Sequence, residues 1–220
     1  MLLAERILLL ARDLSGEPLN SSQKGRDLAR WLGVAVVTEL AAMGRLRFSE
    51  GKVSATDHMP TQHSLLTDAL NLLYRKPNQK VGDAIQLVID HQPRIIAEMC
   101  ESMVRRGLLL HTRKRRFGLF PMHRFPVQST RTYQECLDEL KQAARADDFN
   151  DLRVLALYLL CDGMGLTASH LSADEARDAH ARVAALEDEL TGNRQATDPN
   201  LQRARLILIL TNPFAPEAAA

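Results

Sequence analysis

The segment from Asp27 to Met43 constrains the fold of this chain more than any other. Its apolar residues recur at helical spacing and form a broad face, and Gly33, Val34 and Val37 leave little polar surface elsewhere. A helix that is apolar nearly all round must be covered by other elements. We therefore expect this helix to lie at the centre of a domain, surrounded by other helices.

Helical patterns account for most of the remaining chain. Each pattern has apolar residues at a period of about 3.6, and several begin at a capping signature or end at a glycine. Two residue pairs, Thr132 with Glu135 and Ser172 with Glu175, have the spacing of a capping box, and Asp148 is a candidate N-cap. The expected helices cover residues 2–14, 64–74, 81–89, 93–106, 132–146, 148–161, 172–190 and 201–210.

Two β-hairpins are expected after the glycines that end two of these helices. Residues 45–56, after Gly44, have the pattern of two short strands around a turn. After Gly107, the expected strands are 108–112 and 117–120, and the turn between them consists of Arg113, Lys114, Arg115 and Arg116. The patterns predict a mainly α-helical, single-domain bundle over residues 1–212, with two short β-hairpins, one basic and protruding, and a frayed tail at 213–220.

Charge is nearly balanced over the whole chain but is unevenly distributed. There are 28 Lys and Arg residues and 27 Asp and Glu residues, for a formal net charge of +1. No acid occurs between Glu101 and Glu135, so the rest of the chain, with 20 bases and 27 acids, carries a net charge of −7. Such asymmetry favours an anionic partner. The eight bases of the acid-free segment are Arg105, Arg106, Arg113, Lys114, Arg115, Arg116, Arg124 and Arg131.

The sequence contains no recognisable catalytic or metal-binding motif. HExxH, GxSxG and Walker sequences are absent, and the seven histidines lack the spacings of zinc sites. We therefore expect a protein that is not an enzyme and has neither a cofactor nor a bound metal. An enzyme would require distant residues to converge on a pocket that holds a histidine and carboxylates.

Cysteine content and hydropathy indicate a cytoplasmic protein. Cys100, Cys136 and Cys161 are too few and too far apart for a disulfide framework, so we expect buried thiols in a reducing compartment. The longest apolar runs are far short of the ~20 residues that cross a bilayer. Glu5 and Arg6 interrupt the apolar N-terminal stretch, which argues against a secretory signal.

The basic hairpin is the strongest candidate for a binding site. Apolar residues such as Leu110 and Phe117 are interleaved with its charges, a combination that favours an anionic membrane surface or the backbone of a nucleic acid. A helix ending in Arg-Arg-Gly before a basic hairpin also suits a winged-helix unit, but Glu98 and Glu101 on that helix disfavour DNA. A solvated turn without a partner is the third interpretation.

Trp31 is the only tryptophan of the chain. Its position on an apolar helix favours packing in the core, and a ring at the lip of a ligand pocket is the alternative.

Several sequence blocks resemble the Golgi phosphoprotein three family. The blocks are RILLLARD near the start, TELAAMGRLRF followed by KVSATD, then PTQHSLLTDAL, MVRRGLLL and FGLFPMHRFPV. They occur in the family's order from residue 6 to about residue 127, and the helical remainder is compatible. No counterpart of the long basic N-terminal arm of eukaryotic members precedes Arg6, so we expect a bacterial relative.

The resemblance implies a mostly α-helical domain that binds phosphatidylinositol 4-phosphate, as eukaryotic members do on Golgi membranes. It also implies two further kinds of partner: the tails of membrane proteins, and a second copy of the chain bound through the hairpin from Leu108 to Phe120. We expect a cytoplasmic protein that associates peripherally with an anionic phospholipid membrane. Its candidate lipid-binding residues on the hairpin are Arg113, Lys114, Arg115, Arg116 and Phe117.

The family's head-group pocket uses a tryptophan, an arginine and two further basic residues. When the Gly-Arg-Leu block and the helix-ending glycines are aligned, these positions fall on Gln23, Leu32, Pro93 and Ile96, and none of the four side chains matches. Three residues near these positions are added as candidate lipid-binding residues: Arg30, Trp31 and Arg94.

Overall fold

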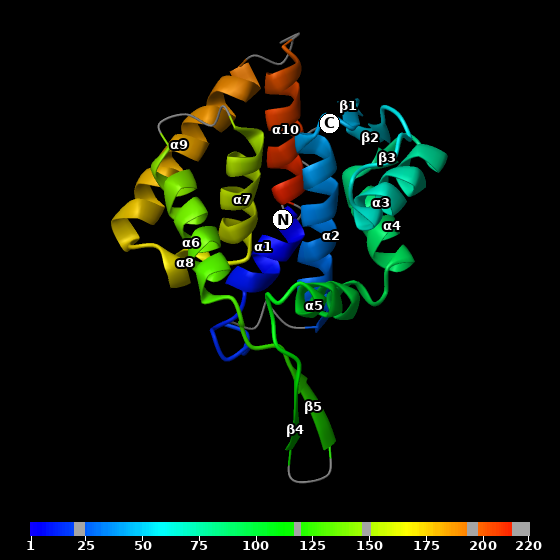
Figure 1. Ribbon diagram of the computed structural model, residues 1–220. Coiled ribbons are helices and arrows are strands. Elements are labelled where there is room, and N and C mark those ends of the chain that lie inside the picture. The colour runs from blue at the N-terminus through cyan, green and yellow to red at the C-terminus, as the bar shows by residue number, and fades with distance from the viewer. Residues whose placement is uncertain (20–24, 117–119, 147–150, 193–197, 213–220) are drawn as a thin grey trace.

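The computed structural model describes residues 1–19, 25–116, 120–146, 151–192 and 198–212. Helices dominate this part of the chain, as the periodicity predicts (Figure 1). Residues 148 and 213–220, for which a helix cap and a frayed tail are predicted, lie outside it. The helices are α1 (Leu3–Leu10), α2 (Gly25–Ala42), α3 (Ser64–Arg75), α4 (Val81–His91), α5 (Ile95–Arg105), α6 (Thr130–Arg145), α7 (Leu152–Gly163), α8 (Thr167–His170), α9 (Ala173–Gly192) and α10 (Pro199–Thr211).

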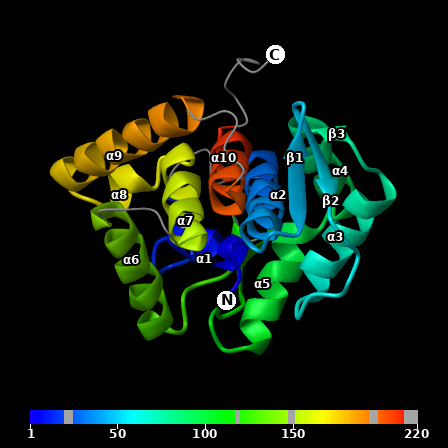
Figure 2. The same ribbon diagram turned by 90° about the horizontal axis from the view of Figure 1, so that it is seen from above.

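Helix α2 lies at the centre of the molecule. Every residue from Trp31 to Ala41 is buried, and α2 contacts α1, α3, α4, α5, α7 and α10. Figure 2 shows α6, α7 and α9 on one side of it and α3, α4 and the small sheet on the other. Because each fully buried aliphatic side chain contributes about 1.5–3 kcal/mol, this helix anchors both halves of the bundle. The predicted central position of this helix is confirmed.

The first predicted hairpin is part of a three-stranded sheet. Strands β1 (Leu46–Ser49) and β2 (Lys52–Ala55) pair antiparallel as predicted, and β3 (Gln79–Lys80) extends the sheet along β2. The segment containing β3, residues 75–80 between the helices expected over 64–74 and 81–89, was predicted to be a loop. Two residues are too few to show a strand period, and β3 is held beside β2 by hydrogen bonds between Ser54 and Asn78.

The helix caps confirm one capping box and correct the other. The Ser172 Oγ accepts from the Glu175 backbone N–H at 3.3 Å, and the Glu175 carboxylate accepts from the Ser172 backbone N–H at 2.9 Å, at the start of α9. Thr132 does not cap α6. Ser129 is the N-cap, because its Oγ accepts from the Thr132 N–H at 3.2 Å, and the α7 cap is Asp151.

The second hairpin extends further along the sequence than predicted. Strands β4 (Thr112–Arg116) and β5 (Phe120–Arg124) pair antiparallel, with Thr112 opposite Arg124 and Arg116 opposite Phe120. The basic run therefore lies in a strand, and the prediction of a basic turn at Arg113–Arg116 is wrong. Residues 117–119, which include the candidate Phe117, lie outside the described residues. The basic run was interpreted as a turn because it separates two apolar segments, but charged side chains also suit an exposed two-stranded ribbon.

Candidate functional site

The β4–β5 hairpin projects from one end of the bundle (Figure 1). Its root is tied to the loop that follows α1, since the Val127 N–H donates to the Leu14 carbonyl at 3.1 Å. Gly16 packs against the backbone of Phe125 with a φ of +83°, and a Cβ there would lie 2.7 Å from the Phe125 carbonyl. This close approach requires glycine and fixes the loop against the hairpin root.

Positive charge is concentrated along the projecting hairpin. Arg113 is exposed and has no ion-pair partner among the described residues, and Lys114, Arg115 and Arg116 continue the same strand away from the bundle. Arg124, on β5, pairs with Glu17 of the loop after α1 at 2.6 Å. The basic segment is therefore presented at the far end of the molecule.

Exposed leucines lie at the hairpin root and on the loop that packs against it. Leu14, Leu110 and Leu19 are 50%, 44% and 36% exposed, respectively. The Leu14 carbonyl accepts from Val127, and the Leu110 N–H donates to the Pro126 carbonyl at 2.8 Å, so the two leucines flank the same short segment. We call Leu14, Leu19 and Leu110 the leucine collar.

Sequence reasoning missed the collar. Leu14 was expected at the end of a helix over residues 2–14, but α1 ends at Leu10 and Leu14 follows in an exposed turn. Leu110 was expected in a strand over residues 108–112, but it lies between the isolated bridge from Leu109 to Val127 and the start of β4 at Thr112. The sequence offers no clear signal for this earlier end, because Ser15 and Gly16 follow Leu14 and the apolar period continues up to it.

The three other candidate lipid-binding residues lie away from the hairpin strands. Trp31 is only 5% exposed, and its ring packs so closely on Gly163 that a Cβ there would lie 2.5 Å from it. Core packing, the first of the two interpretations, accounts for this residue. Arg30 is exposed on α2, and Arg94 precedes α5 and pairs with Glu101 at 3.6 Å. Their role in lipid binding stays a prediction.

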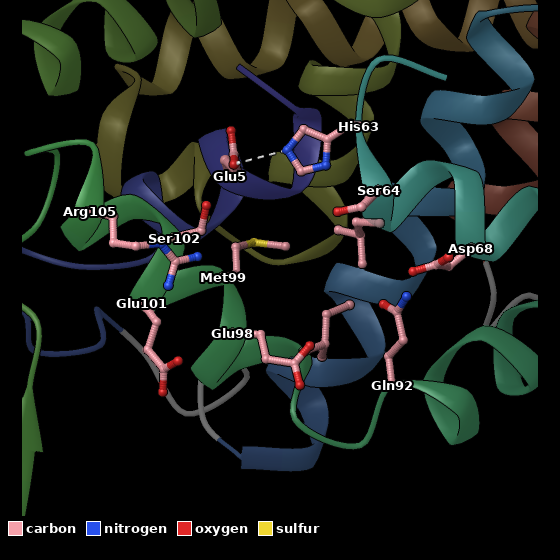
Figure 3. Close-up of a pocket in the computed structure, with 12 residues that line it drawn as sticks. Glu5, His63, Ser64, Asp68, Gln92, Glu98, Met99, Glu101, Ser102 and Arg105 are labelled. Carbon is pink, nitrogen blue, oxygen red and sulfur yellow. Dashed lines mark ion pairs between the residues drawn. The ribbon is translucent and has the colours of Figure 1, made fainter. Parts of the chain in front are cut away.

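A pocket of about 300 Å³ lies between the start of α3 and one face of α5 (Figure 3). Glu5, on α1, lies at its inner side and is buried, and its carboxylate accepts from Arg106 at 2.5 Å and from the Leu2 N–H at 3.1 Å. The His63 Nε2 lies 3.8 Å from the same carboxylate. Arg105 also lines the pocket, together with three further carboxylates, those of Asp68, Glu98 and Glu101.

The electrostatics of this pocket favour a cationic group over a phosphate. Arg106 offsets the charge of Glu5. Three carboxylates then remain, those of Asp68, Glu98 and Glu101, and only two basic groups oppose them: Arg105, and Arg94, which pairs with Glu101. Within the described residues, no hydroxyl or thiol is hydrogen-bonded to the imidazole ring of His63. The pocket therefore brings a histidine and carboxylates together but lacks an activated nucleophile.

The cysteines are buried, as expected, and are poor nucleophiles. Burial raises the pKa of Cys100 to about 11 and that of Cys136 to about 12, and it raises the pKa of Cys161 further. In the described part of the chain, no group of three or more His, Cys, Asp or Glu side chains is placed to hold a metal ion. No helix among those described is long and apolar enough to cross a membrane.

These features define a class of protein: a mainly α-helical domain that presents a basic β-hairpin and exposed leucines at one end. The model of the family described as Golgi phosphoprotein 3 (GPP34) matches residues 3–205. The chain therefore belongs to the Golgi phosphoprotein 3 family, which confirms the resemblance seen in the sequence blocks. Comparison with curated protein sequences found no match.

Replacing Trp31 tests its place in the core. We expect Trp31→Ala to lower the free energy of unfolding by about 3–5 kcal/mol, because a large buried ring would leave a cavity against Gly163. Urea unfolding followed by circular dichroism measures the change. Met59→Ala is the control, since Met59 is 69% exposed and its loss should change stability by about 0.5 kcal/mol or less. A Trp31→Ala variant as stable as this control would contradict the assignment.

Proposed function

We propose that the protein is a non-enzymatic peripheral membrane module that binds anionic phospholipid through its hairpin end. The observation that carries the proposal is the basic strand β4, which projects from the bundle within a segment that has no acidic residue (Figure 1). Membership of the Golgi phosphoprotein 3 family supports it. By family resemblance, the expected head group is that of phosphatidylinositol 4-phosphate, with Arg30 and Arg94 as further candidate contacts. Trp31, whose ring is buried against Gly163, is not retained as a contact.

Charge supplies the long-range part of the attraction. Each Lys or Arg near an anionic leaflet contributes about 1 kcal/mol. The four bases of β4 therefore provide about 4 kcal/mol, which by itself corresponds to a dissociation constant of about 1 mM. Attachment through these charges alone is weak and decreases as salt screens them.

The leucine collar adds a contribution that salt does not screen. Removing apolar surface from water contributes about 25 cal/mol per Å². Leu14 and Leu110 are each about half exposed and lie at the root of the basic hairpin, where a membrane bound to the hairpin would cover them. Shallow insertion of the collar would convert a weak electrostatic encounter into a more stable attachment.

A second copy of the chain and duplex DNA are the two alternative partners for this end of the molecule. Self-association through the hairpin from Leu108 to Phe120 would use the same surface, and light scattering of the free protein measures it directly. A winged-helix mode of DNA binding would place α5 in a groove, but Glu98 and Glu101 line an acidic pocket on that helix. Anisotropy titration with duplex DNA at two salt concentrations separates this alternative from lipid binding.

The first prediction from this proposed function concerns the basic strand. We expect replacement of Arg113, Lys114, Arg115 and Arg116 by serine to lower the affinity for anionic vesicles at least tenfold, which corresponds to about 1.4 kcal/mol. The dependence of binding on salt should become shallower, because fewer charges remain to be screened. Vesicle flotation with phosphatidylcholine and phosphatidylglycerol mixtures measures both effects.

A matched variant controls for the loss of four charges. Arg47, Lys52, Arg75 and Lys76 are exposed bases around the three-stranded sheet and α3, and their replacement by serine should change vesicle affinity less than twofold. Equal losses in the two variants would mean that net charge alone governs binding. A folded hairpin variant with unchanged affinity would refute the role of β4.

The second prediction separates the collar from the charges. We expect Leu14→Ser combined with Leu110→Ser to weaken vesicle binding about tenfold at 0.5 M salt as well as at low salt, because apolar contacts are not screened. Met43→Ser combined with Met59→Ser is the control, since these methionines are exposed but lie outside the collar. A loss that disappears at high salt would contradict an apolar contribution.

A second candidate function follows from the acidic pocket. The family resemblance suggests the tails of membrane proteins as partners, and three carboxylates, those of Asp68, Glu98 and Glu101, would attract a basic tail. Helix α5, which carries two of them, lies at the hairpin end of the bundle (Figure 1). A tail emerging from a bound membrane would therefore have a short path to the pocket.

A fluorescent ten-residue peptide rich in Arg and Lys tests this candidate. We expect Glu98→Gln combined with Glu101→Gln to lower its affinity about fivefold at low salt, as loss of two attractive charges predicts. Asp83→Asn combined with Asp90→Asn is the control, because both acids are exposed on α4 and neither lines the pocket. Equal effects of the two pairs would show that the peptide binds through overall charge.

A further inference from the structure

Two histidines face each other on the hairpin. The Nε2 of His111, directly before β4, lies 2.7 Å from the Nδ1 of His123 on β5. Their rings are nearly parallel, with centroids 5.0 Å apart and an interplanar angle of 17°. Both side chains are exposed to solvent.

The strand register explains why these rings meet. Thr112 pairs with Arg124, so His111 stands beside Phe125, and the two rings stack with centroids 5.1 Å apart. Residues two apart on a strand share a face, which places His123 diagonally across from His111 on that face. Arg113 lies directly opposite His123 in the same register. The imidazoles are therefore held within the basic hairpin itself.

The carboxylates on the loop packed against the hairpin root already form ion pairs or hydrogen bonds with other groups. Arg113 and Arg124 belong to the hairpin, and the loop packed against its root contributes Arg12, Asp13 and Glu17. Glu17 pairs with Arg124, and the Asp13 carboxylate accepts from the Ser15 hydroxyl and the Glu17 N–H. The Arg12 guanidinium donates to the Gly16 carbonyl. In the described residues, no carboxylate forms an ion pair with either imidazole.

The response of the histidine pair to pH depends on the number of protons that the two rings carry. Two neutral imidazoles share one N–H···N bond, and a first added proton leaves that bond in place with a charged donor. A second added proton puts a hydrogen on both facing nitrogens, which breaks the bond and adds repulsion between the rings. An anionic surface beside the pair attracts each positive charge that the rings gain.

We propose that His111 and His123 form a pH-sensitive element that strengthens the attachment of the hairpin to anionic lipid as the pH falls. The inference rests on the proposed function. Imidazole is the side chain that ordinarily gains its charge between about pH 8 and 5. Because a bound anionic surface favours the protonated rings, binding takes up protons, and by linkage acidification raises the affinity.

Vesicle flotation at pH 7.5, 6.5 and 5.5 and constant ionic strength tests the proposal. The vesicles contain phosphatidylcholine and phosphatidylglycerol, whose charges do not change over this range. One to two additional charges at about 1 kcal/mol each predict that the affinity of the unmodified protein rises about tenfold between pH 7.5 and 5.5. The rise should be less than twofold in a variant with His111→Asn and His123→Asn, and intermediate with His123→Asn alone.

The matched control is His91→Asn, because His91 is exposed on α4, away from the hairpin. This variant should keep the full tenfold rise. Two results would overturn the inference but leave the proposed function intact. One is an equal rise in the double histidine variant. The other is an unmodified protein that binds at pH 7.5 with an affinity that does not change as the pH falls. Absence of binding at all three pH values overturns both. If the double variant does not fold, the single His123→Asn variant decides, and an undiminished rise there overturns the inference.

Discussion

Burial of α2 is the constraint on which the rest of the structure depends. A helix with eleven consecutive buried residues, Trp31 to Ala41, cannot be covered from one side, so the chain places helices on both. It also buries Glu39, and burial raises the pKa of that carboxyl group. The Glu39 carboxylate accepts from the Leu3 N–H at 2.8 Å and from Arg153 at 2.6 Å. Because Leu3 begins α1 and Arg153 lies on α7, these two contacts stabilise the buried charge and also orient α1 and α7 around α2.

The orientation of α1 in turn determines what the hairpin end presents. Glu5 satisfies the Leu2 N–H and binds Arg106 at the end of α5, and the loop after α1 is fixed to the hairpin root through Gly16. The end of the bundle from which the hairpin projects (Figure 1) thus presents a basic strand and a collar of exposed leucines, with the acidic pocket (Figure 3) nearby. The two proposed partners, an anionic membrane and a basic protein tail, would each meet the opposite charge at separate places on this end.

Sequence reasoning succeeded where one local pattern decides the structure. The central helix, most other helices and the capping box at Ser172 follow from apolar period and cap chemistry, which depend on neighbouring residues. Sequence reasoning failed where contacts between distant segments determine the structure. The Leu109 bridge to Val127 sets the hairpin register, and with it the strand position of Arg113 and the pairing of His111 with His123. Likewise, the pocket forms only where α1, α3 and α5 meet.

Hydrogen exchange of the full chain, followed by mass spectrometry with and without vesicles, tests the central claim most directly. Anionic vesicles should slow exchange in the loop over residues 11–19 and in the segment over residues 108–127, because a bound membrane covers both. Exchange in α4 and α9 should remain unchanged, and neutral vesicles should leave the whole chain unaffected. Protection by anionic vesicles that appears elsewhere on the molecule and spares the hairpin would contradict attachment through this end.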